Sequence, residues 1–436
     1  MYTLDFPYTT NVEALFLRLS ALPGCAWLDS GRPESSLGRY DILSALPSEQ
    51  ISGDSPSMLK RLNERLLGNA LESELPFCGG WLGYFSYSYR HQAFKLESHK
   101  PEPIASAQFG WYDWALVLDH QEQKANLVFL RSCTEKIRET VLTALQAEKA
   151  AETYTCSAFS HDETREQYLD RLKRIHEYLL SGDCYQVNYT QRFSADFSGS
   201  PAAAYLTLRR AVPSPFSTFL NLSDDAILSI SPERFIQIRG RHALTQPIKG
   251  TSPRGKTAAE DKALQMQLQA SPKNRAENLM IVDLLRNDFS MNCLPHSVTV
   301  PELFGLQSFN NVHHLVSSVE GTLKPHISHP DFILACFPGG SITGAPKKRS
   351  MEIIEELESH SRSIYCGAIG YFSVNGSTDF NVAIRTLLRH GSKLYAWAGG
   401  GIVADSVPAQ EYQESLDKIG SLLAALTDES ANLGSD

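Results

Sequence analysis

The spacing of apolar residues along this chain of 436 residues predicts a mixture of helices and strands. In the segment 12–19 the apolar residues lie three and four positions apart, as on one face of a helix. Thr164 and Gln167 match a capping box at the start of a second amphipathic helix, which we expect to end near Gly182. Short apolar runs predict strands at 26–29, 40–45, 77–87, 113–119, 125–130 and 185–193.

The stretch from Ser231 to Thr251 is predicted to form one β-hairpin that turns at Gly240. Glu233 and Lys249 stand near its two ends. A lysine amine that is removed from water loses its proton more easily and becomes a nucleophile. From this stretch alone, a solvated surface lysine beside an ordinary turn is the simpler interpretation.

Two later helices carry carboxylates that suit a metal ion. Glu277 lies on an otherwise apolar face of the predicted helix 275–286, so it either needs a metal or a buried arginine or is a helix-start glutamate favoured by the macrodipole. Glu411, Glu414 and Lys418 share one face of the last helix. Two carboxylates one turn apart suit Mg²⁺, although solvated surface charges are the commoner explanation of such a pattern.

Three further segments favour the binding of anions. The glycine-rich loop 337–347 runs into a predicted helix at 347–357, where anions can bind, although the P-loop pattern is absent. Arg385 lies among apolar residues of a strand predicted after a turn at 375–376, so it needs an anionic partner, in a ligand or in a structural ion pair. Glycines 399–401 end a strand and either expose N–H groups to a carboxylate or form a flexible turn.

Composition narrows the class of protein. A net charge of -9 argues against nucleic acid or an anionic membrane surface as the main partner. The eight cysteines form no CxxC pair, which is typical of reduced thiols in the cytoplasm. Neither a signal peptide nor an apolar run long enough to span a membrane is visible. The mostly polar stretch 146–162 divides residues 1–155 from residues 160–428, and we expect the two regions to pack as one unit.

Taken in order, several of these segments resemble the chorismate-utilising enzymes. The resemblance covers roughly residues 165–420. The first 155 residues also resemble the N-terminal part of the family, through Trp27-Leu-Asp-Ser-Gly and Arg39-Tyr-Asp-Ile. It implies an α+β fold, a four-layer α/β/β/α arrangement with two orthogonally packed antiparallel sheets. The segments are Gly182-Asp-Cys-Tyr-Gln-Val-Asn, Ser231-Pro-Glu-Arg-Phe, Pro247-Ile-Lys-Gly-Thr, Arg275-Ala-Glu-Asn-Leu, His313-His-Leu-Val-Ser, Pro338-Gly-Gly-Ser-Ile-Thr-Gly-Ala-Pro-Lys, Ala398-Gly-Gly-Gly-Ile-Val-Ala-Asp and Glu411-Tyr-Gln-Glu.

Lys249 distinguishes the branches of this family. The branch that forms 4-amino-4-deoxychorismate carries lysine in this motif, whereas anthranilate and isochorismate synthases typically carry alanine. Gln186 stands where isochorismate and salicylate synthases place a lysine that activates water, which disfavours water as the nucleophile. The resemblance therefore implies an enzyme that aminates chorismate for p-aminobenzoate and folate synthesis. The alternatives are an anthranilate-forming subunit and a non-catalytic, tryptophan-binding regulatory subunit.

The resemblance also implies roles for single residues. Glu233 would protonate the departing 4-hydroxyl, Lys249 would add to the ring before ammonia displaces it, and His314 would orient that end of the ring. Asn274 departs from the family, in which an acidic residue usually stands one turn before the first metal ligand. The implied Mg²⁺ ligands are Glu277, Glu411 and Glu414. The implied substrate-binding residues are Gln186, Thr251, Tyr365, Arg385, Gly400, Gly401 and Lys418.

Two partners besides chorismate are implied. Ammonia would come from solution or from a separate glutamine amidotransferase subunit in a heterodimer. The N-terminal region is expected to contact that partner, and in the family it can hold tryptophan. Ordinary packing is the alternative role for the positions that match the tryptophan site, which are Leu28, Ser30, Arg39, Tyr40, Pro215 and Phe216.

Overall fold

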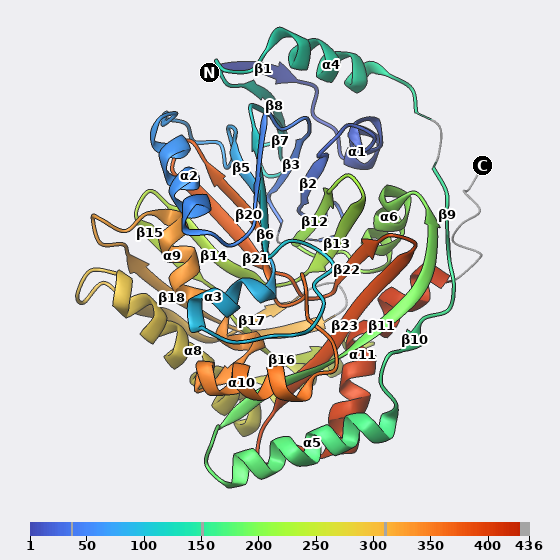
Figure 1. Cartoon of the computed structure of the whole chain (residues 1–436), viewed down its shortest axis with the longest axis vertical. Coiled ribbons are helices and arrows are strands. Elements are labelled where there is room, and N and C mark those ends of the chain that lie inside the picture. The colour runs from blue at the N-terminus through green and yellow to red at the C-terminus, as the bar shows by residue number, and fades with distance from the viewer. Residues whose placement is uncertain (36–37, 150–151, 309–311, 428–436) are drawn as a thin grey trace.

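The computed structural model describes residues 1–35, 38–149, 152–308 and 312–427. Two antiparallel sheets share a hydrophobic core and are covered by helices (Figure 1). The predicted α+β class with two antiparallel sheets is therefore confirmed. Residue 428, the predicted end of the second region, lies outside the described residues.

The first sheet joins strands from both predicted regions of the chain, because β2 pairs with β12. Over the described residues it has 13 strands, two of which, β9 (Tyr154–Cys156) and β19 (Gly344–Ala345), pair with β11 beside the main path. The main path runs β1 (Tyr2–Phe6), β8 (Lys124–Phe129), β7 (Trp114–Asp119), β3 (Tyr40–Ser44), β2 (Ala26–Asp29), β12 (Phe216–Asn221), β13 (Asp225–Ser231), β22 (Thr386–His390), β23 (Lys393–Ile402), β11 (Gln186–Gly199) and β10 (Ser160–His161).

The second sheet also contains strands from both regions, because β20 pairs with β5. It has 10 strands among the described residues, with β17 (Thr299–Ser308) attached to β18 beside the main path. The main path runs β16 (Ile248–Pro253), β18 (Val312–Thr322), β15 (His242–Thr245), β14 (Arg234–Arg239), β21 (Ser377–Val382), β20 (Ala368–Ser373), β5 (Gly80–Phe85), β6 (Ala107–Tyr112) and β4 (Glu49–Ser52).

Helices cover the outer faces of both sheets. The first sheet packs against α1 (Val12–Leu19), α4 (Glu135–Gln146), α6 (Pro201–Ala211) and α11 (Pro408–Thr427). The second sheet is covered by α2 (Pro56–Leu67), α7 (Ala258–Ala270), α8 (Pro272–Asn292) and α9 (His329–Cys336). Both α5 (Arg165–Leu180) and α10 (Lys347–Leu357) contact β11. The connections contain α3 (Arg90–Phe94) and the short 3₁₀ helices η1 (Tyr87–Tyr89) and η2 (Gly340–Ile342).

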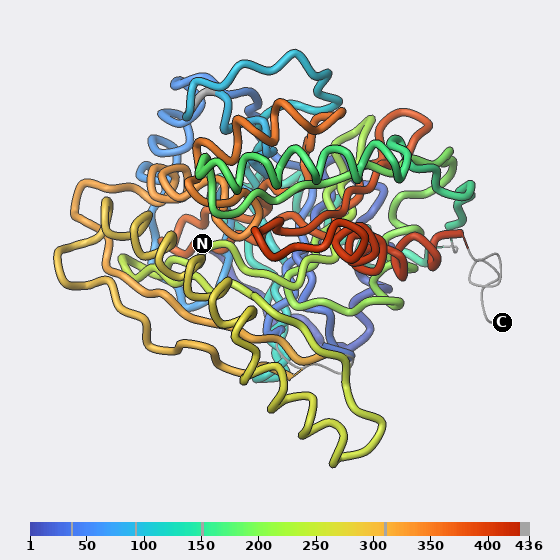
Figure 2. Tube along the Cα trace, turned by 90° about the horizontal axis from the view of Figure 1, so that it is seen from below, coloured from blue at the N-terminus to red at the C-terminus, as the bar shows by residue number. Residues whose placement is uncertain are grey.

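Helix α5 begins where the sequence predicts it. The Thr164 hydroxyl accepts a hydrogen bond from the Gln167 N–H, and the Gln167 side chain accepts one from the Thr164 N–H. This capping box satisfies two N–H groups that a helix end otherwise leaves without partners. Seen from below, α5 and α11 lie side by side at the end of the first sheet formed by β11 and β23 (Figure 2).

The hairpin predicted over 231–251 is wrong in its second half. β14 and β15 do form a hairpin around Gly240, but β15 ends at Thr245 and β16 pairs with β18 instead. Gly250 has a φ of 85°, and a Cβ atom there would lie 3.0 Å from the Asn274 side chain. Glycine therefore lets β16 approach α8 closely, because a larger side chain would be strained in both respects.

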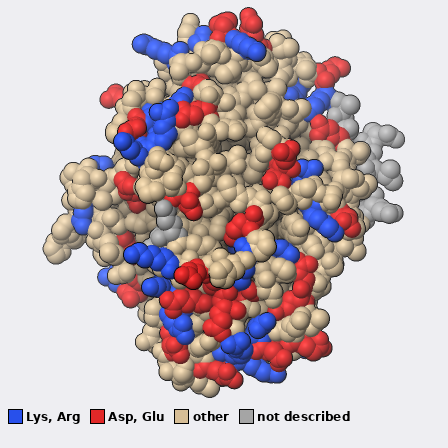
Figure 3. All heavy atoms as spheres, in the orientation of Figure 1, with Lys and Arg blue, Asp and Glu red and all other residues tan. Residues whose placement is uncertain are grey.

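Charges of both signs are interspersed on the face seen in Figure 3, most densely in its lower part, where Figure 1 shows α5 and α10. Among the described residues, none of the helices combines the length and the apolar character required to cross a bilayer.

Candidate active site

The predicted site residues gather around one cavity of about 560 Å³. Its walls come from β11, β16, β18, β23, α8, α11 and η2 and from the segments before β14, β20 and β22. Two of the predicted residues, Gln186 and Gly400, are not among those that line it. The predicted residues that do line it are Glu233, Lys249, Thr251, Glu277, His314, Tyr365, Arg385, Gly401, Glu411, Glu414 and Lys418.

Glu233 and Lys249 meet at a third residue, Ser341 of η2. The Ser341 hydroxyl donates a hydrogen bond of 2.9 Å to Oε1 of Glu233. Nζ of Lys249 donates one of 3.1 Å to the Ser341 carbonyl, which also accepts from Nδ2 of Asn188 at 3.4 Å. A carboxyl group and an amine therefore face the cavity together, bound to the same residue.

The surroundings of this pair alter both protonation equilibria. Glu233 is 5% exposed, and burial raises its pKa to about 7 against the opposing effects of Lys249 and the Ser341 hydroxyl. Burial lowers the pKa of Lys249 from its ordinary value of 10.5, although nearby carboxylates, Glu233 first among them, oppose the change. A carboxyl group that keeps its proton near neutral pH can serve as a general acid, and an amine that loses its proton more easily can serve as a nucleophile.

His314 and Thr251 form a cross-strand pair between β18 and β16. Their Nδ1 and Oγ1 atoms lie 2.9 Å apart. Burial, together with the nearby Arg385, lowers the pKa of His314 to about 4. The imidazole is therefore neutral at neutral pH, and it orients or hydrogen-bonds a ligand without adding charge.

Arg385 lies between two strands rather than within one. Its φ is 50°, and it occupies the short connection from β21 to β22, so the predicted continuous strand is wrong here. Within the described part of the chain no acidic side chain forms an ion pair with Arg385. Burial lowers the pKa of Arg385, because it penalises the charged form. A cation in the cavity wall without such a partner suits an anionic ligand. Tyr365, nearby in the wall, stacks on Trp397 with ring centroids 6.2 Å apart.

Carboxylates of α11 converge above Gly400. A Cβ atom on Gly400 would lie 3.3 Å from Oε2 of Glu411, 3.5 Å from Nζ of Lys418 and 3.8 Å from Oε1 of Glu414, so glycine lets these charged groups approach the strand closely. Burial raises the pKa of Glu411, while Lys418, whose Nζ is 2.7 Å from Glu414, helps to hold the pKa of Glu414 below its ordinary value despite burial.

The third predicted ligand, Glu277, lines the same cavity, and its carboxylate lies 4.0 Å from Nζ of Lys273. Among the described residues, no three acidic, histidine or cysteine side chains lie close enough together to hold a metal ion. The donor chemistry nevertheless fits Mg²⁺, because carboxylate oxygens are its preferred protein ligands.

Gln186 and the three glycines lie at one edge of this site. Glycines 399–401 are strand residues of β23 paired with β11, and not a flexible turn. A Cβ atom on Gly401 would lie 2.8 Å from Nε2 of Gln186. The Gln186 side chain is fully buried, and within the described residues neither of its polar atoms has a hydrogen-bond partner.

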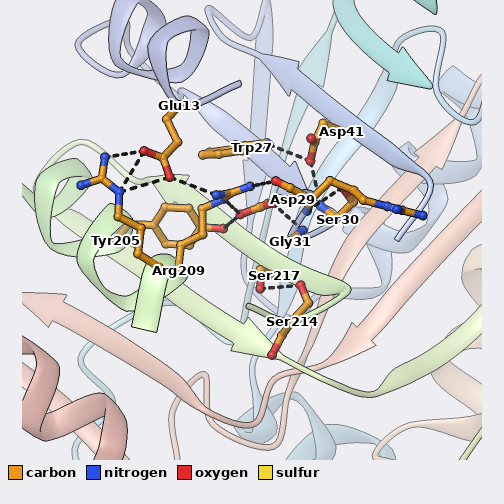
Figure 4. Close-up of polar contacts among 12 residues, drawn as sticks. Glu13, Trp27, Asp29, Ser30, Gly31, Asp41, Tyr205, Arg209, Ser214 and Ser217 are labelled. Atoms are coloured by element: carbon orange, nitrogen blue, oxygen red, sulfur yellow. Dashed lines mark hydrogen bonds and ion pairs between the residues drawn. The ribbon is translucent and has the colours of Figure 1, made fainter. Parts of the chain in front are cut away.

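The positions predicted for tryptophan border a second cavity of about 370 Å³ between the sheets. Ser30 is the exception, because it does not line the cavity and its N–H donates to Asp41 at 2.8 Å. Asp29, also in the wall, accepts from Tyr205 and Arg209, and burial raises its pKa to about 7 (Figure 4). The predicted positions that line the cavity are Leu28, Arg39, Tyr40, Pro215 and Phe216.

Sequence reasoning missed Ser341, Asn188 and Trp397, which all line the first cavity. Ser341 and Asn188 occur in segments that carry the family resemblance, so the motifs themselves marked both neighbourhoods. The contacts of Ser341 with Glu233 and Lys249 could not be predicted from the sequence, because the three residues lie in distant segments of the chain.

Comparison with known proteins identifies the family and agrees with the fold. The model of the chorismate binding enzyme family matches residues 24–424, so the chain belongs to this family of enzymes and the predicted resemblance is confirmed. Aminodeoxychorismate synthase component 1 of Klebsiella aerogenes is 42% identical over 95% of this chain and 96% of that protein. The protein of that name from Bacillus subtilis is 36% identical over 89% of each chain. Among solved structures, anthranilate synthase component I from Streptococcus pneumoniae aligns with a TM-score of 0.80 at 30% identity, covering 89% of this chain and 93% of that one.

Proposed function

We propose that this protein aminates chorismate to 4-amino-4-deoxychorismate, the precursor of p-aminobenzoate in folate biosynthesis. The observation that carries the proposal is the pairing of a lysine amine with a buried, proton-retaining carboxyl group in one cavity. The names of the relatives at 36–42% identity, aminodeoxychorismate synthase component 1, support the same reaction.

The proposed reaction forms and breaks one bond at a time on the ring. Glu233 donates its proton to the 4-hydroxyl, the carbon–oxygen bond breaks, and water leaves. Nζ of Lys249, as the free amine, forms a carbon–nitrogen bond to the ring and passes a proton to the Glu233 carboxylate. Ammonia next forms its own bond to the ring while Glu233 returns that proton to the departing lysine amine, and the proton that the new ammonium group loses restores the Glu233 carboxyl group, so no oxidant or reductant is needed.

The substrate is a dianion, and the proposed contacts supply the opposite charge. Arg385, which has no acidic partner among the described residues, and Lys418 would bind its carboxylates. Thr251 and Tyr365 would add neutral hydrogen bonds, and neutral His314 would orient the ring without competing for the acidic proton. The buried amide of Gln186 lies beside the glycines of β23, behind the residues that line the cavity, and would not activate water.

Glu277, Glu411 and Glu414 would hold Mg²⁺ in this scheme. When bound there, the ion supplies positive charge to a carboxylate of the substrate. Lys418 and Lys273, which now neutralise Glu414 and Glu277, would have to give way. The close approach of the Glu411 and Glu414 carboxylates to Gly400 supports this assignment.

A separate glutamine amidotransferase subunit would supply ammonia, as the word component in the names of the relatives suggests. The eight free cysteines, seven of them buried, fit a reducing compartment, and we place the protein in the cytoplasm. The cavity bordered by Leu28 and Tyr40 supports a further proposal, that tryptophan binds between the sheets.

Product identity tests the proposed function. Purified protein is incubated with chorismate, Mg²⁺ and ammonium, and half of the mixture is then treated with aminodeoxychorismate lyase. We expect p-aminobenzoate only in the treated half. Anthranilate without the lyase would indicate the anthranilate-forming alternative, and unconsumed chorismate, even with an amidotransferase and glutamine, would indicate a non-catalytic regulatory subunit.

A further inference from the structure

Ser341 lies where the acid and the nucleophile of the proposed reaction come together. Glu233 precedes β14, and Lys249 lies in β16. These two strands do not pair with each other, since β14 lies between β15 and β21 while β16 pairs with β18. The pairing of these strands therefore does not by itself set the position of one reacting group relative to the other, although the backbone N–H of Ile248, next to Lys249, also bonds to the Glu233 carboxyl group. Ser341 contacts both, through its hydroxyl and its carbonyl.

The segment that carries Ser341 is itself held by buried groups. Arg362, whose side chain is 1% exposed, donates to the carbonyl of the next residue, Ile342, at 2.9 Å and also to the carbonyl of Asn188. Arg362 in turn forms a buried ion pair with Glu358. Backbone as well as side-chain bonds fix η2 against β11, because the Asn188 N–H donates to the Thr343 carbonyl at 2.8 Å. The hydroxyl of Ser341 thus projects from a restrained loop.

We propose that Ser341 is a positioning residue for the reaction, which holds the Glu233 carboxyl group in register with the Lys249 amine. A hydroxyl suits this role because it can donate to a carboxylate and accept from a carboxylic acid. The contact therefore persists on both sides of the proton transfer. This inference rests on the proposed function.

The test compares three variants in the ammonia-dependent reaction. In Ser341→Ala we expect kcat to fall roughly ten- to hundredfold, with KM for chorismate within about twofold, because the variant loses the hydrogen bond to the carboxylate that Glu233 becomes as it gives up its proton. Ser341→Thr keeps a hydroxyl and should recover most of the loss. Thr343→Val is the matched control, because it removes from the same loop a hydroxyl that donates to the Gly339 carbonyl and contacts neither reacting group, and its kcat should stay within about threefold.

A second readout does not depend on turnover. The pKa of Glu233 can be followed by infrared difference spectroscopy, with Glu233→Gln to identify the band. Lys249 is the charged group that faces Glu233, and the Ser341 hydroxyl lowers the pKa of Glu233, so Ser341→Ala should raise it. Thr343→Val should not.

The outcomes separate this inference from the proposed function. Wild-type protein that makes no aminated product would overturn the function, and the infrared measurement would still decide the role of Ser341. An unchanged kcat in Ser341→Ala, an equal loss in Thr343→Val, or an unmoved pKa of Glu233 would each overturn the positioning role.

Discussion

Replacing Glu233 with glutamine isolates the proton that the proposed reaction requires. Glutamine keeps the shape of the side chain and its contact with Ser341 but has no acidic proton to give. A general acid contributes about a hundred- to ten-thousandfold in rate, so we expect kcat to fall by roughly that factor. At pH 7 a carboxyl group with a pKa of about 7 keeps its proton in about half of the molecules, and at pH 8 in about a tenth.

The pH dependence supplies a second signature. Raising the pH through about 7 removes the acidic proton of Glu233, whereas it increases the neutral fraction of Lys249, whose pKa lies below its ordinary 10.5. The two requirements oppose each other, so the wild-type profile should be bell-shaped. In Glu233→Gln the limb that belongs to the carboxyl group should disappear.

The assay is lyase-coupled formation of p-aminobenzoate at a fixed concentration of free ammonia. Glu163→Gln is the matched control, because Glu163 is also buried with a raised pKa but does not line the cavity that Glu233 faces. A Glu233→Gln protein that keeps more than about a third of the wild-type kcat, or that keeps both limbs of the profile, would refute the assignment of the general acid.

Three further predictions follow from the same geometry. Gly400→Ala should weaken Mg²⁺ binding in calorimetric titrations without abolishing folding, because its methyl group would press on the Glu411 carboxylate; unchanged affinity would argue against a metal above Gly400. Arg385→Gln should raise KM for chorismate roughly tenfold or more while the melting temperature hardly changes, and an unaltered KM would remove Arg385 from substrate binding. Arg362→Met should lower the free energy of unfolding by about 3–5 kcal/mol in urea titrations, because Glu358 would remain buried without its partner; a loss below about 1 kcal/mol would contradict the importance of that ion pair.

Local patterns predicted the elements that are decided by local chemistry. The apolar face at 12–19 and the capping box at Thr164 both gave helices with nearly the predicted bounds. The prediction of one hairpin over 231–251 was wrong because its length and turn signals do not reveal that β18 lies between β15 and β16 in the sheet. The last strand of the segment, β16, pairs with β18, and this pairing is set by tertiary contacts.

The site was predicted as a set of residues but not as a set of contacts. Glu233 and Lys249 do face one cavity, yet they reach it from different strand pairs and not from one hairpin. Arg385 was expected in a strand, and its positive φ shows that it lies in a connection that no apolar pattern marks. Ser341 was missed because a serine in a glycine-rich loop has many ordinary roles, and only the fold brings it to both reacting groups.

The covalent step is the central claim, and the mass of the protein tests it most directly. The protein is incubated with chorismate and Mg²⁺ without ammonia, quenched, and measured intact and after digestion, with Lys249→Ala as the control. We predict a mass increase equal to chorismate less water on the peptide that contains Lys249, absent in the control and lost when ammonium is added. Wild-type protein that stays unmodified yet aminates chorismate, or a Lys249→Ala protein that aminates at the wild-type rate, would contradict the lysine adduct.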